Sequence, residues 1–340
     1  MPINYQPSSF SSVNRDSMRG PNASGLPLNG TIVQRRDLND GLTALTIALH
    51  GWELPPFEAG QYIDIALQTR STLNQSVQLD STRFVQNELI RRSYSIASSP
   101  KRRDQFELLL NLVPRGEFTP ALWRLEEGAR LHVNPRVRGR FTLTSALENH
   151  AHDIHVVDDP DVYRNTVPVA DREAAAADHP EPATSSSHDW PTFHPHLIFI
   201  ATGTGLAPYM SMLRDNEGSD PPWASATLLH SVRHAEDLAY RDELDALATL
   251  DGFRFRYIPT VTRPRPETGW TGHIGRLQPL LEANRYAELT NGRSIRPEDT
   301  HIYLCGNPEM IQSLRETFEA QGFVRHTSNT PGNLHFESYW

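Results

Sequence analysis

The chain has 340 residues, of which 38% are hydrophobic, and a formal net charge of −9 at pH 7. This length predicts two domains. The single cysteine, Cys305, excludes a disulfide framework and a cysteine-ligated iron–sulfur cluster within the chain, and no apolar run approaches the roughly 20 residues of a membrane-spanning helix. We expect a monomer in a reducing compartment, the cytoplasm or an organellar matrix or stroma, with no nucleic-acid or membrane partner.

The first domain is predicted to be a β-barrel. Residues 1–27, rich in Ser, Asn and Pro, are expected to form a disordered tail rather than a transit peptide, because they include Asp16 and lack an amphipathic face. From residue 28 to 145, short apolar runs alternate with turn signals, most clearly at residues 31–33, 45–49, 62–67, 106–113 and 130–133. Six or so short strands without a helical period predict a six-stranded antiparallel Greek-key β-barrel.

Residues 91–100, Arg-Arg-Ser-Tyr-Ser-Ile-Ala-Ser-Ser-Pro, have the chemistry of a flavin site. The Arg92 guanidinium can bind two phosphates bidentately. Tyr94 offers a flat face to an isoalloxazine ring, and the small hydroxyl of Ser95 can approach flavin N5 without blocking it. Taken alone, the run could equally be an amphipathic strand with Tyr94 and Ile96 on one face.

A turn at residues 114–120, Pro-Arg-Gly-Glu-Phe-Thr-Pro, leads into a helix predicted over residues 121–125. Gly116, followed by Thr119 as the helix N-cap, would present free backbone N–H groups to an anion. We interpret this turn as a second contact with the FAD pyrophosphate, opposite Arg92. A capped surface helix would explain Thr119 and Pro120 equally well.

Charge is distributed unevenly along the chain. Eleven Arg or Lys and five acidic residues lie between residues 91 and 145, whereas ten acidic residues and two arginines lie between residues 146 and 195. The second segment also has a serine tract and little hydrophobic periodicity, so residues 146–195 are predicted to be an acidic flexible insertion. His150 and His152, without a cysteine, are a weak metal signal, and we expect no metal.

Residues 196–340 alternate between strand and helix patterns. Apolar runs at residues 196–201, 226–232, 253–260 and 301–305 predict strands, with helices over residues 209–214 and 235–248 and a final helix ending near residue 321. This predicts a doubly wound parallel α/β sheet, which binds ligands at the carboxyl ends of its strands. The loop at residues 202–208, Thr-Gly-Thr-Gly-Leu-Ala-Pro, suits a dinucleotide pyrophosphate, although Pro208 replaces the third glycine of the full fingerprint.

The end of the second strand indicates which dinucleotide binds. An NAD enzyme usually has an acidic residue there, whereas an NADP enzyme supplies arginine for the 2′-phosphate. Here the strand ends in Ser231 and Arg233, and Arg263 and Arg265 follow the third strand. The sequence therefore predicts NADP(H).

Four motifs occur in order along the chain: Arg92-Ser-Tyr-Ser, Gly203-Thr-Gly-Leu-Ala-Pro, Cys305-Gly-Asn-Pro-Glu-Met and the terminus Phe336-Glu-Ser-Tyr-Trp. In this order and spacing they resemble the ferredoxin–NADP(+) reductase family, above all its bacterial ferredoxin/flavodoxin reductases that end in Tyr-Trp. The resemblance covers residues 28–145 and 196–340. It implies an FAD-binding barrel, an NADP(H)-binding domain, and an enzyme that passes electrons between NADPH and ferredoxin or flavodoxin.

The resemblance also implies roles for individual residues. On the flavin, Arg92, Tyr94 and Ser95 would hold the ring and phosphates, Tyr339 would cover the other face of the ring, and Trp340 would stack on the adenine. The ribityl and pyrophosphate path would be lined by Leu110, Leu112, Gly116, Phe118 and Thr119. The catalytic residues would be Ser95, Cys305, Glu337 and Tyr339, with Cys305 bordering the nicotinamide.

On the dinucleotide, Thr202 and Gly203 would contact the pyrophosphate and nicotinamide side, and Arg233 and Arg263 the 2′-phosphate. One position departs from the bacterial relatives, whose Thr-Gly-Arg is here Thr271-Gly272-His273. His273 would make a weaker, pH-dependent contact, for which Arg265 or Arg276 could compensate.

The electron acceptor must dock from outside, because the chain carries no cluster of its own. The basic run around Arg91, Lys101, Arg102 and Arg103 is a candidate surface for an acidic ferredoxin or flavodoxin, and a solvated charged loop is the alternative. For the chain as a whole, two other functions stay open: a reductase component of an oxygenase or a free-flavin reductase, and a non-catalytic flavin-binding interaction protein.

Overall fold

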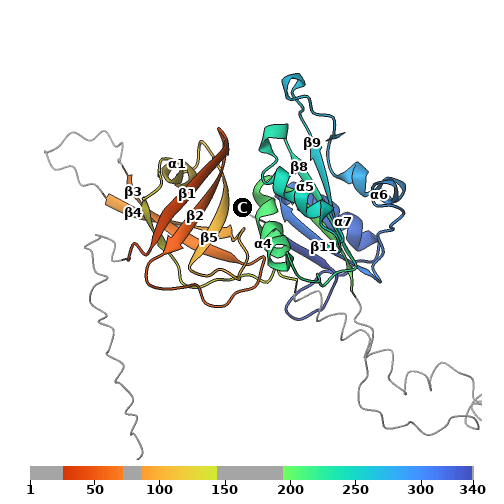
Figure 1. The fold of residues 1–340 in the computed structure, drawn as a ribbon, viewed down its shortest axis with the longest axis horizontal. Helices are drawn as coiled ribbons and strands as arrows, with labels where there is room; N and C mark the ends of the chain where they lie inside the picture. The colour runs from red at the N-terminus through yellow and green to blue at the C-terminus, as the bar shows by residue number, and fades with distance from the viewer. Residues whose placement is uncertain (1–25, 72–85, 144–193, 339–340) are drawn as a thin grey trace, which may run out of the picture.

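The computed structural model describes residues 26–71, 86–143 and 194–338. They form an antiparallel barrel beside a parallel sheet that is covered by helices (Figure 1). Within these residues no helix is long and apolar enough to cross a membrane. The predictions for the N-terminal tail and for the acidic insertion fall almost entirely outside the described part of the chain.

The barrel has six strands: β1 (Gly30–Asn39), β2 (Leu42–Leu49), β3 (Tyr62–Ser71), β4 (Gln86–Ser95), β5 (Gln105–Asn111) and β6 (Arg130–Val133). They follow the order β4-β3-β6-β1-β2-β5, all neighbours are antiparallel, and a bridge between Ile96 and Leu108 joins the two edges. Strand β6 lies between β3 and β1 although it comes last, as in a Greek key. The predicted six-stranded barrel is confirmed.

The second sheet is parallel throughout. Its strands are β7 (His196–Thr202), β8 (Ser225–Val232), β9 (Phe255–Val261), β10 (His273–Ile274), β11 (Thr300–Gly306) and β12 (Leu334–Ser338), in the order β10-β9-β8-β7-β11-β12. Four helices pack against the sheet: α4 (Ala207–Asn216), α5 (Arg241–Thr249), α6 (Ala283–Leu289) and α7 (Pro308–Ala320). Because β7 lies inside the order and the chain winds outwards on both sides, the predicted doubly wound sheet is confirmed.

The side chains of β7 point alternately to the two faces of the sheet, and helices cover both faces. Phe199 and Ala201 pack with residues of α4 and α5, whereas Ile198 and Ile200 pack on the other face with residues of α6 and α7. Successive side chains of a strand point to opposite faces, so a strand with helices on both sides must be apolar at every position. This requirement explains the unbroken apolar run that first indicated the strand.

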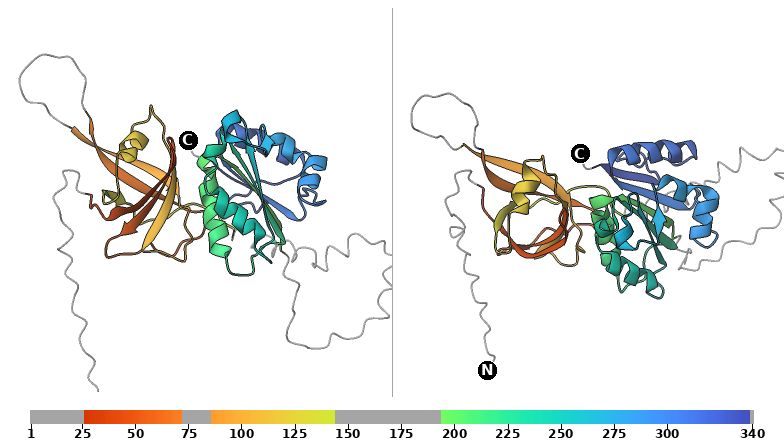
Figure 2. Two further views of the ribbon diagram at one scale, coloured as in Figure 1. Left: turned by 45° about the horizontal axis from the view of Figure 1, so that its top comes forward. Right: turned by 90° about the horizontal axis from the view of Figure 1, so that it is seen from above.

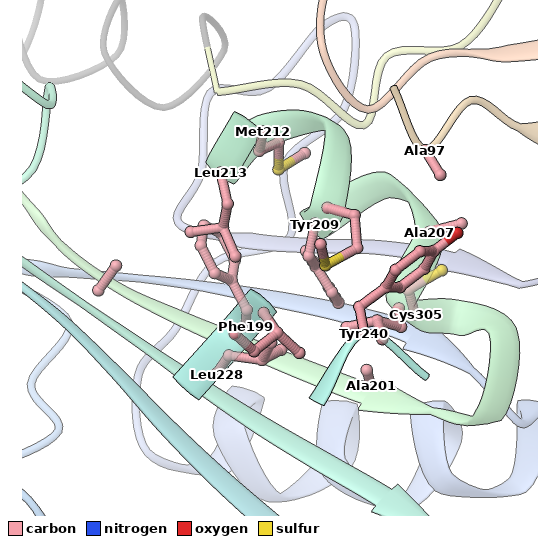
Figure 3. Packing of buried hydrophobic residues seen from close by; sticks show 14 of the residues in the cluster. Ala97, Phe199, Ala201, Ala207, Tyr209, Met212, Leu213, Leu228, Tyr240 and Cys305 are labelled. Atoms are coloured by element: carbon pink, nitrogen blue, oxygen red, sulfur yellow. The ribbon is translucent and has the colours of Figure 1, made fainter. Parts of the chain in front are cut away.

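The barrel and the sheet share one hydrophobic core. Helix α4 lies between them (Figures 1 and 2), and its Tyr209 and Met212 belong to the same buried cluster as Ala97 and Leu109 of the barrel. Figure 3 shows the part of this cluster around α4, where Tyr209 and Met212 lie between Phe199 of β7 and Ala97. The continuous apolar contact fixes how the two bodies sit against each other.

Polar contacts reinforce this seam. The Arg214 guanidinium lies 2.8 Å from the carboxylate of Glu107 and 2.6 Å from that of Glu243, and the Tyr240 hydroxyl donates to Glu107 at 2.8 Å. Arg214 also donates to the carbonyl of Ala97. A half-buried arginine with two carboxylates and a carbonyl is a well-satisfied group, and it ties β5 of the barrel to α4 and α5.

Two predicted helices differ from the observed ones. The helix predicted over residues 235–248 is split into a 3₁₀ turn (Ala235–Asp237) and α5, because the Asp237 carboxylate accepts the His234 N–H and Tyr240 has a φ of 55°. The other, α1 (Phe118–Trp123), begins before Thr119 and has no side-chain N-cap. Thr119 therefore does not cap α1; its hydroxyl is bound to the backbone N–H and C=O of Val113 instead.

Candidate functional site

The carboxyl ends of β7 and β11 meet where the sheet reverses its winding direction. Gly205 lies so close to β11 that a Cβ there would overlap the carbonyl of Cys305, and a Cβ at Gly306, whose φ is 127°, would overlap Thr202. The Asn307 N–H donates to the Thr202 hydroxyl at 2.7 Å. Glycine is required at both positions for the two loops to approach, and this is the place where doubly wound sheets bind ligands.

A first cavity of about 270 Å³ opens at the seam, on the barrel side of this point. It brings together β4, β5, the turn before α1 and the loop after β7; its lining residues are Arg92, Ser93, Tyr94, Ser95, Leu109, Asn111, Val113, Gly116, Phe118, Thr119, Thr204 and Ala207. The ring of Tyr94 lies 6.1 Å from that of Phe118, and burial raises the pKa of its hydroxyl. The motif at Arg92 and the turn at Gly116, 24 positions apart in the chain, therefore share one wall.

Leu110 and Leu112, which were expected on this wall, are not among the residues that line the cavity. The residues of this segment that line the cavity are Leu109, Asn111 and Val113. Leu110 points the other way, into the barrel core with Phe106. Since side chains of a strand alternate between faces, an error of one position in the register exchanges the two sets.

Ser95, Cys305 and Glu337 lie together at the seam. The Ser95 hydroxyl, which is buried, donates to a Glu337 carboxylate oxygen at 3.3 Å, and Glu337 pairs with Cys305 in the ladder between β11 and β12. Burial raises the pKa of Glu337 to about 7, against the opposing effect of the Ser95 hydrogen bond. Glu337 can therefore hold or release a proton near neutral pH. Tyr339 and Trp340 lie outside the described residues.

A second cavity of about 620 Å³ lies over the carboxyl ends of the parallel strands. Thr202 and Gly203 line it, and so do Arg233 and Arg276. Asn111 and Thr204 line both cavities, so the two adjoin at these side chains. A group bound in one cavity would lie next to a group bound in the other.

The arginines expected near a 2′-phosphate do not all reach this second cavity. Arg263 does not line this cavity. It lies in the turn after β9, where its side chain is exposed and its backbone N–H donates to the Arg233 carbonyl at 2.8 Å. Arg265 forms an ion pair with Glu236 at 2.5 Å, and His273 also lies outside the lining. Of the two residues considered as replacements for the missing arginine, only Arg276 faces the cavity.

His230 is a residue of this site that the sequence patterns did not single out. It is fully buried in β8, with Nε2 3.1 Å from the Gly203 carbonyl and Nδ1 3.3 Å from the Tyr257 hydroxyl. Burial lowers the pKa of His230 to about 4, so the ring is neutral at pH 7 and Nε2–H donates to Gly203. A histidine in the middle of a strand that is buried at nearly every position was the available signal. It orients the carbonyl of the Gly203 loop, whose φ is 54°.

The walls of the two cavities fit the groups that the sequence indicates. The first has flat apolar surfaces from Tyr94, Leu109 and Phe118, with the Arg92 guanidinium at its exposed side. Its volume is near the lower end of the ~300–1,000 Å³ typical of ligand pockets, so it can enclose a ring system but not a whole dinucleotide. The second combines a glycine loop at a strand end with Arg233 and Arg276, as phosphate recognition requires.

Comparison with known proteins gives consistent results. Residues 64–141 match the model of the oxidoreductase FAD-binding domain, and residues 199–316 match that of the oxidoreductase NAD-binding domain. The flavodoxin/ferredoxin–NADP reductase of Escherichia coli is 26% identical over 314 residues, covering 92% of this chain and 98% of the relative. Ferredoxin–NADP reductase B of Sorangium cellulosum is 29% identical, covering 85% and 90%.

Among solved structures, the ferredoxin NADP+ reductase of Neisseria gonorrhoeae with bound FAD and NADP superimposes with a TM-score of 0.64, at 20% identity, over 92% of this chain and 98% of that one. The two domain matches lie on the two bodies of the fold, and each contains one of the cavities' defining loops. The chain therefore belongs to the ferredoxin/flavodoxin–NADP(+) reductase family, a family of oxidoreductases whose cofactors are FAD and NADP(H).

Proposed function

We propose that the chain transfers electrons between NADPH and a one-electron carrier, a ferredoxin or a flavodoxin, through FAD held at the seam. The observation that carries this proposal is the junction of the two cavities at Asn111 and Thr204, which would bring a flavin ring and a nicotinamide ring into contact. FAD supplies the conversion between the two-electron chemistry of nicotinamide and the one-electron chemistry of the carrier. The protein positions the two cofactors, sets the polarity of their surroundings and supplies protons.

On the flavin side, Arg92 binds the phosphates, and Tyr94 packs against one face of the ring. Ser95 and Glu337 form a proton relay: Glu337, with its pKa near 7, exchanges a proton with the Ser95 hydroxyl, which faces the first cavity. Cys305 sets the spacing at the strand end, where its carbonyl closes on Gly205. For Tyr339 and Trp340, which lie outside the described residues, we keep the roles that the resemblance implies: Tyr339 would cover the opposite face of the ring and yield to the nicotinamide, and Trp340 would stack on the adenine.

On the dinucleotide side, Arg233 and Arg276 bind the 2′-phosphate and give NADPH its advantage over NADH. Both face the second cavity, whereas Arg263, first expected in this role, does not. Thr202 and Gly203 contact the pyrophosphate, with His230 holding the Gly203 loop in place. A charge-assisted hydrogen bond to phosphate contributes about 1.5–3 kcal/mol, so each arginine accounts for roughly a tenfold to hundredfold preference.

The carrier docks on the barrel near the flavin site. Arg91 is exposed in the second half of β4 and offers positive charge to an acidic partner. The rest of the predicted basic run contributes less, because Arg102 and Arg103 form ion pairs with Asp104 and Glu53, and Lys101 donates to the Asp215 carbonyl. Salt should therefore slow the reaction with the carrier, while the reaction with NADPH should depend on it less.

The test is to purify the protein with its flavin and compare its reduction by NADPH and by NADH in a stopped-flow spectrophotometer. We expect a yellow protein that NADPH bleaches at least tenfold more efficiently, and that then reduces ferredoxin or flavodoxin. Rapid turnover with free riboflavin and none with either carrier would point instead to a flavin reductase or an oxygenase component. Failure of NADPH to bleach the flavin would point to a non-catalytic protein.

A further inference from the structure

A third cavity, of about 740 Å³, lies at the amino-terminal ends of the parallel strands, opposite the end where the glycine loop lies. His196, Ser225 and Phe255, at the amino-terminal ends of β7, β8 and β9, form one wall, and the loop after α6 forms another. Strand β7 has seven residues, so this end is about 20 Å from the glycine loop at its other end. Neither proposed cofactor reaches it, and the proposed electron transfer does not use it.

The charge on the walls of this cavity is strongly positive. Arg254, Arg256, Arg293 and Arg296 all line it, and Asp299 is the only acidic residue among the lining residues that the structure describes. Such a concentration of guanidinium groups around a concave space is costly unless anions compensate it.

Two of the four arginines already have hydrogen-bond or ion-pair partners within the protein. Arg254 lies against the Trp223 carbonyl at 2.9 Å and the Asp220 carboxylate at 3.2 Å, and Arg296 forms an ion pair with Asp299. These contacts hold the rim of the cavity in shape. They leave Arg256 and Arg293 as the groups available to a ligand.

Arg256 and Arg293 have no carboxylate within ion-pair distance among the residues of the described ranges. Arg293 Nη1 instead lies close to both ring nitrogens of His196, 2.7 Å from Nε2 and 3.0 Å from Nδ1, and Nδ1 also lies 2.9 Å from the Ser225 hydroxyl. Burial and then the charge of Arg293 lower the pKa of His196, which favours the neutral ring. A guanidinium that uses an imidazole as its partner lacks a better, anionic one.

The two available arginines come from different elements but act on the same space. Arg256 is in β9 and Arg293 is in the loop after α6, and both residues line this cavity. They can therefore contact two parts of one ligand.

We propose that this cavity binds a small molecule carrying at least two phosphate groups, with Arg256 and Arg293 each holding one. Arginine binds phosphate bidentately, and the volume is that of a typical small-molecule site. Hydroxyls of Ser225 and Ser294 on the same walls offer further hydrogen bonds. The ligand binds about one strand length away from the cofactors, so the site can modulate the enzyme without competing with NADPH.

Calorimetric titration with pyrophosphate, on flavin-bound full-length protein saturated with NADP+, tests the proposal. Saturation with NADP+ keeps the probe out of the dinucleotide cavity. We expect binding that weakens about tenfold in Arg256→Gln and in Arg293→Gln, and more in the double variant, with NADPH oxidation unchanged in all three. Arg254→Gln is not suitable, because it would disturb the rim; Arg263→Gln, exposed and outside every cavity described here, is the matched control and should bind as the wild type does.

A second readout is the NMR titration of His196. An anion beside Arg293 stabilises the imidazolium, so pyrophosphate should raise the pKa of His196. Absence of binding, equal binding by the double variant, or no response of His196 would overturn the proposal. Binding that emerges only when residues 150–190 are deleted would also overturn it, since the chain's own acidic segment would then be the occupant.

Discussion

Replacing Glu337 by glutamine should make the protein more stable at alkaline pH and no more stable at acidic pH. Glutamine keeps the shape of the side chain and can still accept the Ser95 hydrogen bond, but it cannot ionise. In the wild type, the folded protein raises the pKa of Glu337 to about 7 from its usual 4.5, chiefly by burial. The folded state therefore holds a proton that the unfolded state gives up between these two values.

The sign and size of the effect follow from linkage. Below pH 4.5 the carboxyl is protonated in both states and costs nothing; between pH 4.5 and 7 stability falls as pH rises; above pH 7 the full penalty applies. The separation of about 2.5 between the two pKa values corresponds to roughly 3 kcal/mol. For a domain of this size, that shifts the melting temperature by on the order of 5 °C.

The assay is thermal unfolding, followed by circular dichroism, of wild type and Glu337→Gln at pH 5 and pH 8.5. The melting temperature of the variant should exceed that of the wild type by several degrees at pH 8.5, and the gap should narrow to about a quarter of that at pH 5. Glu298→Gln, which changes an exposed carboxylate, is the control and should show no such gap. The same gap at both pH values would refute the account of a buried, protonated Glu337. In kinetics, Glu337→Gln should also remove any dependence of flavin reduction on a group titrating near pH 7.

Three further variants test the rest of the site. Arg276→Ala should lower kcat/KM for NADPH about tenfold to hundredfold and leave that for NADH unchanged in steady-state assays, since the 2′-phosphate is the only difference between the two; a parallel loss for both would remove Arg276 from the phosphate contact. His230→Leu should raise KM for both dinucleotides more than it lowers kcat, because it frees the Gly203 carbonyl, and an unchanged KM would contradict the positioning role. Gly205→Ala should destabilise the fold by about 1–3 kcal/mol in urea unfolding, because its Cβ overlaps the Cys305 carbonyl; a variant of wild-type stability would show that the two loops are further apart.

The sequence was sufficient for elements whose pattern is local and strong. The apolar run of β7 and the glycines after it predicted both a buried parallel strand and a dinucleotide loop, because burial on both faces and close backbone approach each demand particular residue types. The short alternating strands predicted the barrel for the same reason. Short elements such as β10 and α6 carried too little periodicity to be recognised.

The local sequence pattern could not predict which residues line a cavity where this depends on strand register or on contacts between distant parts of the chain. Whether Leu109 or Leu110 faces the flavin cavity depends on which face of β5 the barrel closes around, and the pattern Leu-Leu-Leu at residues 108–110 gives no preference. Likewise the sequence favoured Arg263 as a phosphate ligand and offered Arg276 only as a replacement for the missing arginine. Only the packing of the turn after β10 brings Arg276 to the cavity.

What the sequence by itself determined is the identity of the two domains and the chemistry of their loops, since these rest on residues that are close together in the chain. What only the tertiary structure decided is the contact between Ser95 and Glu337, with the raised pKa of the Glu337 carboxyl, and the basic cavity. Ser95 and Glu337 are 242 positions apart, and it is the parallel pairing of β12 with β11 that buries the carboxylate and sets its pKa. Arg256 and Arg293 likewise line one cavity because strand β9 begins, and the loop after α6 runs, at the same end of the sheet, a proximity that follows from topology and not from sequence spacing.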